Sequence, residues 1–330
     1  MAGGALRPWR ARVRDRLLDW RERWVGVADP FADWSAAPPD ASGRFESFGA
    51  WPSRHVTPRR IDVWLPPGYD EPDAVPHAVL YMHDGQHLFD PATAAGGHPW
   101  AVGHHVTMQM LAGRMRPTIV VGVWNTPLRY AEYAPAPALL RLPAPLYALT
   151  VEAGHPAGGP FESLSEGYLH FLIDELKPVI DARYRTRRGP ADTAVMGASM
   201  GALASLHALV ARPDVFGAAG CLSTHWPLTI NPALLGHGGD VRLRDIAAAG
   251  LGWLAESLPA AGRHRLYFDH GDRHLDGLYG PFQHRVDELA FARGYRPGVD
   301  FRSLLFPRAA HHERAWRSRL GQALSWLLPA

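Results

Sequence analysis

Cysteine is almost absent from this sequence. A single cysteine, Cys221, occurs among 330 residues, so an intramolecular disulfide is excluded. Cys221 lies in the apolar run AAGCLS, where a cysteine is more often a small packing residue than a reactive thiol. We therefore expect Cys221 in the core, and the cysteine content does not indicate an oxidising compartment.

The sequence also lacks a strong net charge and a long hydrophobic run. The formal net charge is +2, which provides no overall field to recruit nucleic acid. No apolar run is long enough to span a bilayer, and the arginine-rich N-terminus has no apolar core typical of a secretory signal. These absences favour a cytoplasmic protein that does not insert stably into membranes, and they are compatible with a homo-oligomer.

Metal-binding motifs and internal repeats are lacking as well. The 18 histidines form no HExxH string, and no carboxylate–histidine spacing typical of a helical metal site occurs. No repeat is found along the chain. The sequence therefore predicts no metal site.

Residues 1–45 are predicted to form an amphipathic helical extension ahead of a single domain over residues 46–330. Apolar side chains recur there at three- and four-residue steps, and most arginines fall elsewhere. We expect this helix to pack on its own domain or on a partner subunit, with a membrane-surface helix as the alternative. The apolar positions are Leu6, Trp9, Val13, Leu17, Trp20 and Trp24.

The rest of the chain alternates strand-like and helix-like segments. This alternation predicts an α/β fold with a mostly parallel central sheet and helices on both faces. Residues 134–160 are rich in Pro, Ala and Gly without clear periodicity, and we predict a long loop at the rim of a site. Strands are expected over 59–65, 77–83, 117–123, 192–197, 216–223, 264–271 and 300–307, and helices over 165–184, 200–211, 280–293 and 313–327.

The stretch VMGASMGAL, residues 195–203, places Ser199 between Gly197 and Gly201 where a strand passes into a helix. A serine at so tight a turn holds its hydroxyl above the sheet, and the glycines let neighbouring backbone pass without a Cβ clash. The helix N-terminus would offer N–H groups to a developing oxyanion. We interpret Ser199 as a nucleophile; the alternative is a glycine-bounded turn with a spectator serine.

An unactivated serine hydroxyl is a poor nucleophile, so a histidine must take its proton and an acid must orient that histidine. In α/β-hydrolase order both follow the serine, and the acid comes first. His311 has the most suitable position, because it follows the last strand candidate and precedes the closing helix. His312 is the competing candidate.

The acid is expected just past a strand end. The segment LYFDHGDRHLDGLYGPFQ supplies three aspartates, of which Asp269 is expected within the strand. Asp272 and Asp276 both fall in the following loop, and spacing alone does not separate them.

Two backbone N–H groups are needed to stabilise a tetrahedral oxyanion. The residue after the nucleophile, Met200, would supply one. The segment YMHDGQHLFDP ends an earlier strand at a glycine-containing turn, so Gly85 and Gln86 can present the second. The alternative for this turn is a plain loop.

With these motifs in place, the sequence resembles the esterase family of α/β-hydrolases that includes enterochelin esterases, feruloyl esterases and the esterase D group. The resemblance covers roughly residues 55 to 328, in the family's order. It is carried by PRRIDVWLPPGYD, YMHDGQHLFDP, VGVWNTPLRYAEYAP, MGASMGAL, FGAAGCLSTHWP, LYFDHGDRHLDGLYGPFQ and HHERAWRSRL. Two departures are Ala202, where the family usually has a second glycine, and His87, which replaces an asparagine.

The resemblance implies Ser199 as nucleophile and His311 as base, because HHERAW contains the family's H-x-E-x-x-W string. It favours Asp276 over Asp272, since a Leu-Asp pair before an aromatic-rich helix recurs in the family. Gln86 and Met200 map onto the oxyanion-hole positions. Six further residues map onto loops around the pocket: Asp84, Trp124, Asn125, Arg129, His225 and Trp226. For Arg129 and Trp226, a structural role is expected at least as much as a role in the pocket.

Together, the residues and the resemblance predict a serine carboxylic-ester hydrolase that acts on a small-molecule ester through an acyl-enzyme, without a cofactor. One alternative is acyl transfer to a sugar or alcohol with the same triad. The other is a non-catalytic binding protein on the same fold.

Overall fold

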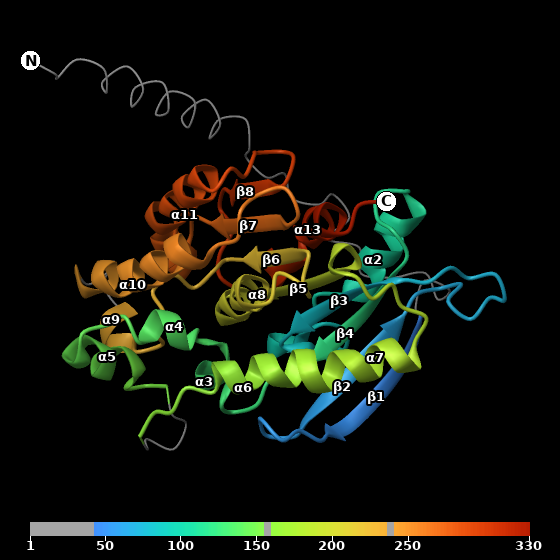
Figure 1. The fold of residues 1–330 in the computed structure, drawn as a ribbon, viewed down its shortest axis with the longest axis horizontal. Coiled ribbons are helices and arrows are strands. Elements are labelled where there is room, and N and C mark those ends of the chain that lie inside the picture. Colours follow the sequence, from blue (N-terminus) through green and yellow to red (C-terminus); the bar gives the residue numbers. More distant parts are fainter. Residues whose placement is uncertain (1–42, 155–159, 236–240) are drawn as a thin grey trace, which may run out of the picture.

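This computed structural model describes residues 43–154, 160–235 and 241–330. Their central element is an eight-stranded sheet (Figure 1). The strand order is β1-β2-β4-β3-β5-β6-β7-β8, and the pairs from β4 to β8 are parallel. This confirms the predicted α/β fold with a mostly parallel sheet. The strands are β1 (Arg44–Trp51), β2 (Arg59–Leu65), β3 (Ala78–His83), β4 (Thr118–Val123), β5 (Thr193–Ala198), β6 (Ala218–Leu222), β7 (Arg265–Gly271) and β8 (Phe301–Phe306).

The central strands form because their side chains are apolar or small on both faces. Every residue of β3, β4 and β5 is buried, as expected for parallel strands covered by helices. At one edge of the sheet, β1 pairs antiparallel with β2 and is largely exposed. Strand β1 was not predicted, because its few apolar side chains are irregularly spaced and form neither a continuous apolar run nor a regular alternation.

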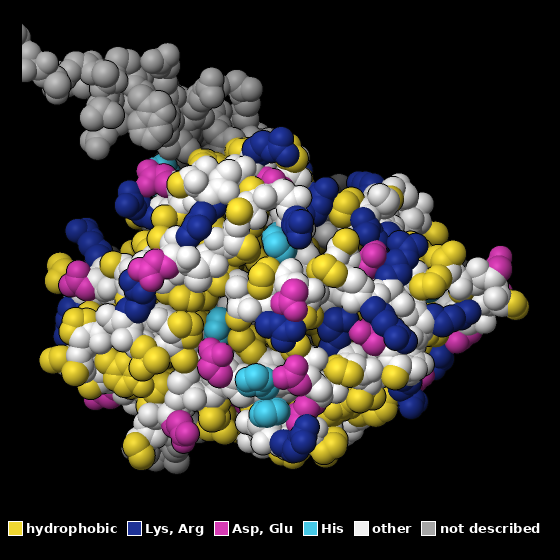
Figure 2. All heavy atoms as spheres, viewed as in Figure 1, with side chains coloured by type: hydrophobic (Ala, Val, Ile, Leu, Met, Phe, Trp, Pro, Cys, Tyr) yellow, Lys and Arg dark blue, Asp and Glu magenta, His cyan; other side chains and the backbone are white. Residues whose placement is uncertain are grey.

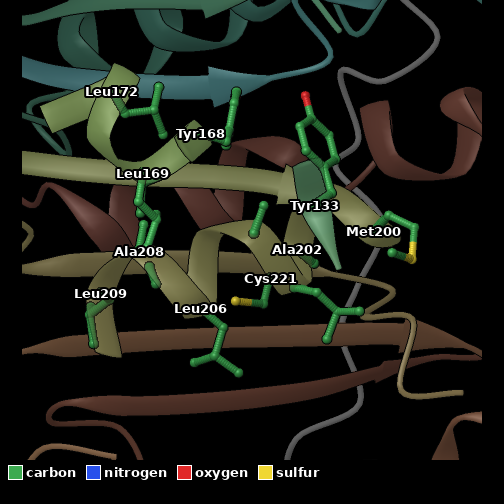
Figure 3. Close-up of a cluster of buried hydrophobic side chains, with 14 of the residues drawn as sticks. Tyr133, Tyr168, Leu169, Leu172, Met200, Ala202, Leu206, Ala208, Leu209 and Cys221 are labelled. Atoms are coloured by element: carbon green, nitrogen blue, oxygen red, sulfur yellow. The ribbon is translucent and has the colours of Figure 1, made fainter. Parts of the chain in front are cut away.

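Helices cover both faces of the sheet, as predicted (Figure 1). One core contains side chains of α6 (Ser165–His170), α8 (Met200–Ala211), α10 (Val241–Ser257) and α11 (Gly280–Ala292). The core on the other face contains side chains of α2 (Val102–Leu111), α12 (Glu313–Arg317) and α13 (Leu320–Leu327). Figure 3 shows part of the first core, where Cys221 is fully buried, as the sequence analysis expected.

Short helices occupy the stretch that the sequence analysis predicted as a long loop over residues 134–160. They are α4 (Ala136–Leu139) and α5 (Ala144–Val151), and each carries a proline in its first turn, where the missing N–H has no intrahelical partner to lose. Both pack against α10, a helix that was also not predicted. Hydrophobic side chains gather over α5 in Figure 2. The loop prediction is therefore wrong for these residues, and residues 155–159 lie outside the described ranges.

The predicted helix over residues 165–184 is continuous but changes type in its middle. Helix α6 passes into a π-helical segment, η4 (Phe171–Leu176), and then into α7 (Lys177–Arg183). Pro178 stands in the first turn of α7 and cannot donate a backbone hydrogen bond. A wider π-helical turn just before a proline is one way in which a helix accommodates that loss.

The predicted helical extension over residues 1–45 lies outside the described residues except at its end, where residues 44 and 45 already belong to β1. Among the described helices, none has both the length and the apolarity to cross a bilayer. Acidic and basic side chains are interspersed on the face drawn in Figure 2.

Candidate active site

The residues singled out from the sequence gather at the carboxyl edge of the parallel strands. Ser199 follows β5, and Asp276 and His311 follow β7 and β8. Gln86 and Asn125 follow β3 and β4, the neighbouring strands. In sheets of this kind, ligands bind in the crevice outside the carboxyl ends of the strands. Segments that lie far apart in the sequence therefore meet at one edge.

Ser199 occupies a strained turn between β5 and α8, with φ 58° and ψ −122°. A non-glycine residue in this conformation is uncommon and marks a constraint imposed by the surrounding structure. A Cβ added to Gly197 would lie 2.7 Å from the Gly201 carbonyl, and one added to Gly201 would lie 3.2 Å from the Asp84 carboxylate. Close approach of backbone therefore requires glycine at position 197, as the sequence pattern predicted, and leaves only tight room for a side chain at position 201.

A chain of hydrogen bonds joins Ser199, His311 and Asp276. His311 Nε2 lies 2.9 Å from Ser199 Oγ, and His311 Nδ1 lies 2.6 Å from Asp276 Oδ1. An ionised carboxylate only accepts hydrogen bonds, so Nδ1–H donates to Asp276 and Nε2 is left to accept from the serine hydroxyl. In this tautomer the imidazole can take the serine proton.

The competing residues lie elsewhere. His312 caps α12, where its Nδ1 accepts a hydrogen bond of 3.2 Å from the Ala315 amide. Asp272 accepts from the Arg308 amide at 2.7 Å, and its side chain is 42% exposed. Asp269 lies within β7, as expected from the sequence. Of the two histidines, only His311 has a hydrogen bond to Ser199 within the described residues, and of the three aspartates only Asp276 has one to His311. These bonds favour His311 as the base and Asp276 as the acid.

The Asp276 carboxylate is fully buried and receives several donors. Its Oδ2 accepts from the Gly271 amide and from the Ser223 hydroxyl, each at 2.7 Å. Burial alone would raise the pKa of Asp276, but the hydrogen bonds from His311, Gly271 and Ser223 outweigh it and lower the pKa below its ordinary value. Asp276 is therefore ionised and acts as an acceptor toward His311 at neutral pH.

The turn after β3 lies beside the N-terminus of α8. Asp84 has a left-handed backbone with φ 59° and precedes a short 3₁₀ turn, η2 (Gly85–His87). Gln86 is the second residue of η2 and Met200 is the first residue of α8, so both amides belong to first helical turns, whose N–H groups have no intrahelical acceptor. A pair of unsatisfied N–H groups near a nucleophile can stabilise a developing oxyanion.

Hydrogen bonds and an ion pair to the Asp84 carboxylate hold the turn after β3 in place. Arg129 binds Asp84 with two bonds of 2.7 Å, and Asn125 adds a third at 2.6 Å. Burial would raise the pKa of Asp84, but the Arg129 guanidinium outweighs it and lowers that pKa. Arg129 belongs to α3 (Arg129–Tyr133), in which Glu132 forms a second, fully buried ion pair with Arg59. Helix α3 thus fixes the turn through its charged side chains.

The other residues predicted around the pocket, Trp124, His225 and Trp226, mostly contact neighbouring protein side chains. Trp124 donates to Asp62 at 2.6 Å and lines a groove of about 350 Å³ that Gly85 also lines. His225 and Trp226 are buried, and Trp226 donates to Gln283 at 3.2 Å. Burial lowers the pKa of His225 to about 4, so this histidine is neutral. Trp226 and Arg129 thus both make contacts that suit a structural role, one of the two roles expected for them from the sequence.

Two site residues were not singled out from the sequence. Ser223 lies one residue past β6 and contacts Asp276 directly. Arg319 is fully buried and forms an ion pair of 2.9 Å with Asp269. Arg319 occurs three residues after Trp316 and one before Leu320, on the apolar face of the closing helical segment, and this spacing could have identified it as a buried charge.

Metal ligands do not cluster in the described residues. Across residues 43–154, 160–235 and 241–330, no group of three or more His, Cys, Asp or Glu side chains could hold a metal ion.

Comparison with known proteins extends over most of the chain. The sequence model of the family described as "Putative esterase" matches residues 54–327. A Bacillus subtilis (strain 168) protein described as "Uncharacterized protein YbbA" is 25% identical over 169 residues, which are 51% of this chain and 58% of that protein. The chain thus matches somewhat more than half of that relative's length.

Solved structures share the fold at low sequence identity. A ferulic acid esterase is 17% identical with a TM-score of 0.57, over 86% of this chain and 98% of that one. The enterobactin esterase FES of Shigella flexneri is 16% identical with a TM-score of 0.58, over 91% of this chain and 62% of that one. The ferulic acid esterase AmCE1/Fae1A of Anaeromyces mucronatus is 20% identical with a TM-score of 0.54, over 88% and 94%. The family match, which covers well over half of the sequence, shows that this chain belongs to the esterase family, on an α/β-hydrolase fold.

Proposed function

We propose that the protein hydrolyses carboxylic esters of small molecules through an acyl-enzyme on Ser199. The observation that carries this proposal is the hydrogen-bonded chain from Ser199 Oγ through His311 to Asp276, built on a strained turn at the start of α8. Membership in the esterase family supports the same reaction class.

In the first half of the reaction, Ser199 Oγ attacks the ester carbonyl carbon while His311 Nε2 takes the hydroxyl proton. The carbonyl oxygen becomes an oxyanion, which accepts hydrogen bonds from the amides of Met200 and Gln86. Asp276 holds the imidazole in the required tautomer and stabilises the imidazolium. The bond to the leaving alcohol then breaks, and His311 gives its proton to the alcohol oxygen.

In the second half, water takes the place of the serine hydroxyl. His311 removes a proton from the water, whose oxygen attacks the acyl carbon and forms a second tetrahedral intermediate. The bond to Ser199 breaks, the proton returns to Ser199 Oγ, and the carboxylic acid leaves. No step requires a group outside the protein other than ester and water.

Labelling with a fluorophosphonate probe tests the nucleophile, because the probe reacts with activated serines. We expect the folded wild-type protein to be labelled on Ser199, and Ser199→Ala to take no label and to lose ester hydrolysis with little change in melting temperature. His311→Ala should lower kcat by several orders of magnitude, leaving a residual rate from the oxyanion hole. A folded wild-type protein that takes no label and hydrolyses none of a panel of aryl, acetyl and longer-chain esters would refute the proposal.

A further inference from the structure

The Ser223 hydroxyl lies at the centre of a buried cluster behind the His311–Asp276 pair. Its Oγ is 2.7 Å from Asp276 Oδ2, 2.9 Å from Trp316 Nε1 and 2.6 Å from Arg319 Nη2. Ser223 itself is fully buried, as is Arg319, and Trp316 is nearly so. All three partners therefore interact with this hydroxyl away from bulk water.

Counting donors and acceptors fixes the direction of each hydrogen bond. An indole N–H and a guanidinium can only donate, so Trp316 and Arg319 both donate to the Ser223 oxygen and occupy its two lone pairs. The hydroxyl proton of Ser223 can then make one further hydrogen bond, as a donor. Ionised Asp276 can only accept, so that proton is donated to Asp276 Oδ2.

We infer that Ser223 is a positioning residue for the proposed ester hydrolysis, whose locked hydroxyl holds Asp276 Oδ2 and so keeps Oδ1 aimed at His311. The inference rests on the proposed function, since Ser223 acts on the reaction through Asp276 and touches no reacting atom. The Gly271 amide is the second donor to Oδ2, so the carboxylate is held from two directions.

The same cluster also orients the histidine. The Trp316 ring packs edge-on against His311 with ring centroids 5.0 Å apart, while its Nε1 donates to Ser223. Arg319 is held in turn by Asp269 at 2.9 Å, and its Nη2 lies 3.8 Å from Asp276. One indole therefore links the orientation of the base to that of the acid.

A double-mutant cycle with Asp276 tests this inference. Ser223→Ala removes the hydroxyl, and Ser223→Gly does so as well while suiting the left-handed backbone of this residue, whose φ is 43°. We expect either variant to lower kcat and the rate of fluorophosphonate labelling about 10- to 100-fold, as for the loss of a hydrogen bond to a charged group, with KM little changed. In an Asp276→Asn background the same change should cost less than about threefold, because the group through which Ser223 acts is already altered.

Ser165→Ala provides the matched control. Ser165 is as buried as Ser223, but its hydroxyl accepts from the Ala136 amide and has no route to Asp276. This variant should lose stability without losing rate. If Ser223→Gly is labelled as fast as the wild type, or is slowed equally in both Asp276 backgrounds, the inference is wrong while the proposed function stands. A wild-type protein that takes no label would instead refute the proposed function, and the inference with it.

Discussion

The two halves of the candidate site both contain buried arginines, but they connect those arginines to the site in different ways. The acid–base half, formed by the loops after β6, β7 and β8, centres on a hydroxyl that relays hydrogen bonds between Arg319, Trp316 and Asp276. The oxyanion half, formed by the loops after β3 and β4, is held by the ion pairs Asp84–Arg129 and Arg59–Glu132.

This difference follows from what each half has to do. In the proposed reaction His311 gains and loses a proton, so its partners must stabilise it in both charge states. Arg319 lies 2.9 Å from Asp269 but 3.8 Å from Asp276, and its hydrogen bond on the side of Asp276 goes to the Ser223 hydroxyl. A neutral hydroxyl donor meets that need, because it orients a carboxylate without neutralising it. In the proposed reaction no side chain of the turn after β3 gains or loses a proton, so fixed ion pairs can hold the backbone of that turn.

The largest expected effect is in the acid–base half. Asp276→Asn should lower kcat about 10⁴-fold, because an amide no longer holds the imidazole in the tautomer that accepts the serine proton. Ester hydrolysis under saturating substrate measures this. Asp272→Asn is the matched control and should leave kcat within about twofold; if it is the more damaging of the two changes, the acid has been wrongly assigned.

In the oxyanion half, the expected effect is on stability. Glu132→Gln leaves the Arg59 guanidinium buried without its counter-charge and should lower the free energy of unfolding by about 3–5 kcal/mol in urea titrations. Glu256→Gln breaks an exposed ion pair with Arg141 and should unfold like the wild type. A Glu132→Gln protein as stable as the wild type would mean that the ion pairs do not hold this half.

Each half also contains a buried neutral histidine, which links stability to pH. Burial lowers the pKa of His83 and of His225 to about 4, from an ordinary value of 6.5. Between these values the unfolded chain binds more protons than the folded one, so stability is complete above pH 6.5 and falls as the pH drops toward 4. The loss should reach on the order of 3 kcal/mol per histidine.

Urea unfolding at several pH values between 7 and 4 measures this dependence. Asp269 acts in the opposite direction, because burial raises its pKa to about 6, so the net slope is smaller than two histidines alone would give. His225→Gln should reduce the dependence of the unfolding free energy on pH by the contribution of one histidine. An unchanged slope in that variant would show that His225 is protonated equally in the folded and unfolded states.

The smallest effect is expected at the neighbour of the base. His312→Ala removes the side-chain cap of α12 and should cost about 1 kcal/mol of stability, by chemical denaturation, with kcat within about twofold. A loss of kcat as large as that of His311→Ala would mean that the base has been assigned to the wrong histidine of the pair.

Local sequence patterns predicted the central strands and the turn around Ser199 correctly, because buried apolar runs and closely packed glycines leave a direct mark on neighbouring residues. They failed for β1, whose exposed side chains carry no apolar run, and for α4 and α5, whose prolines are typical of loops as well as of first helical turns. Helix α10 was also missed.

The alternation of the central strands with helices, the turn that carries Ser199, and the small set of histidines and aspartates able to serve it follow from the sequence alone. The tertiary structure decided which members of that set meet. Ser199 and His311 are 112 residues apart, and the choice of Asp276 over Asp272 depends on how the loop after β7 folds against β6 and the closing helices. Backbone conformation is set largely by near neighbours, whereas a hydrogen bond between distant side chains exists only once the sheet has brought their strands to a common edge.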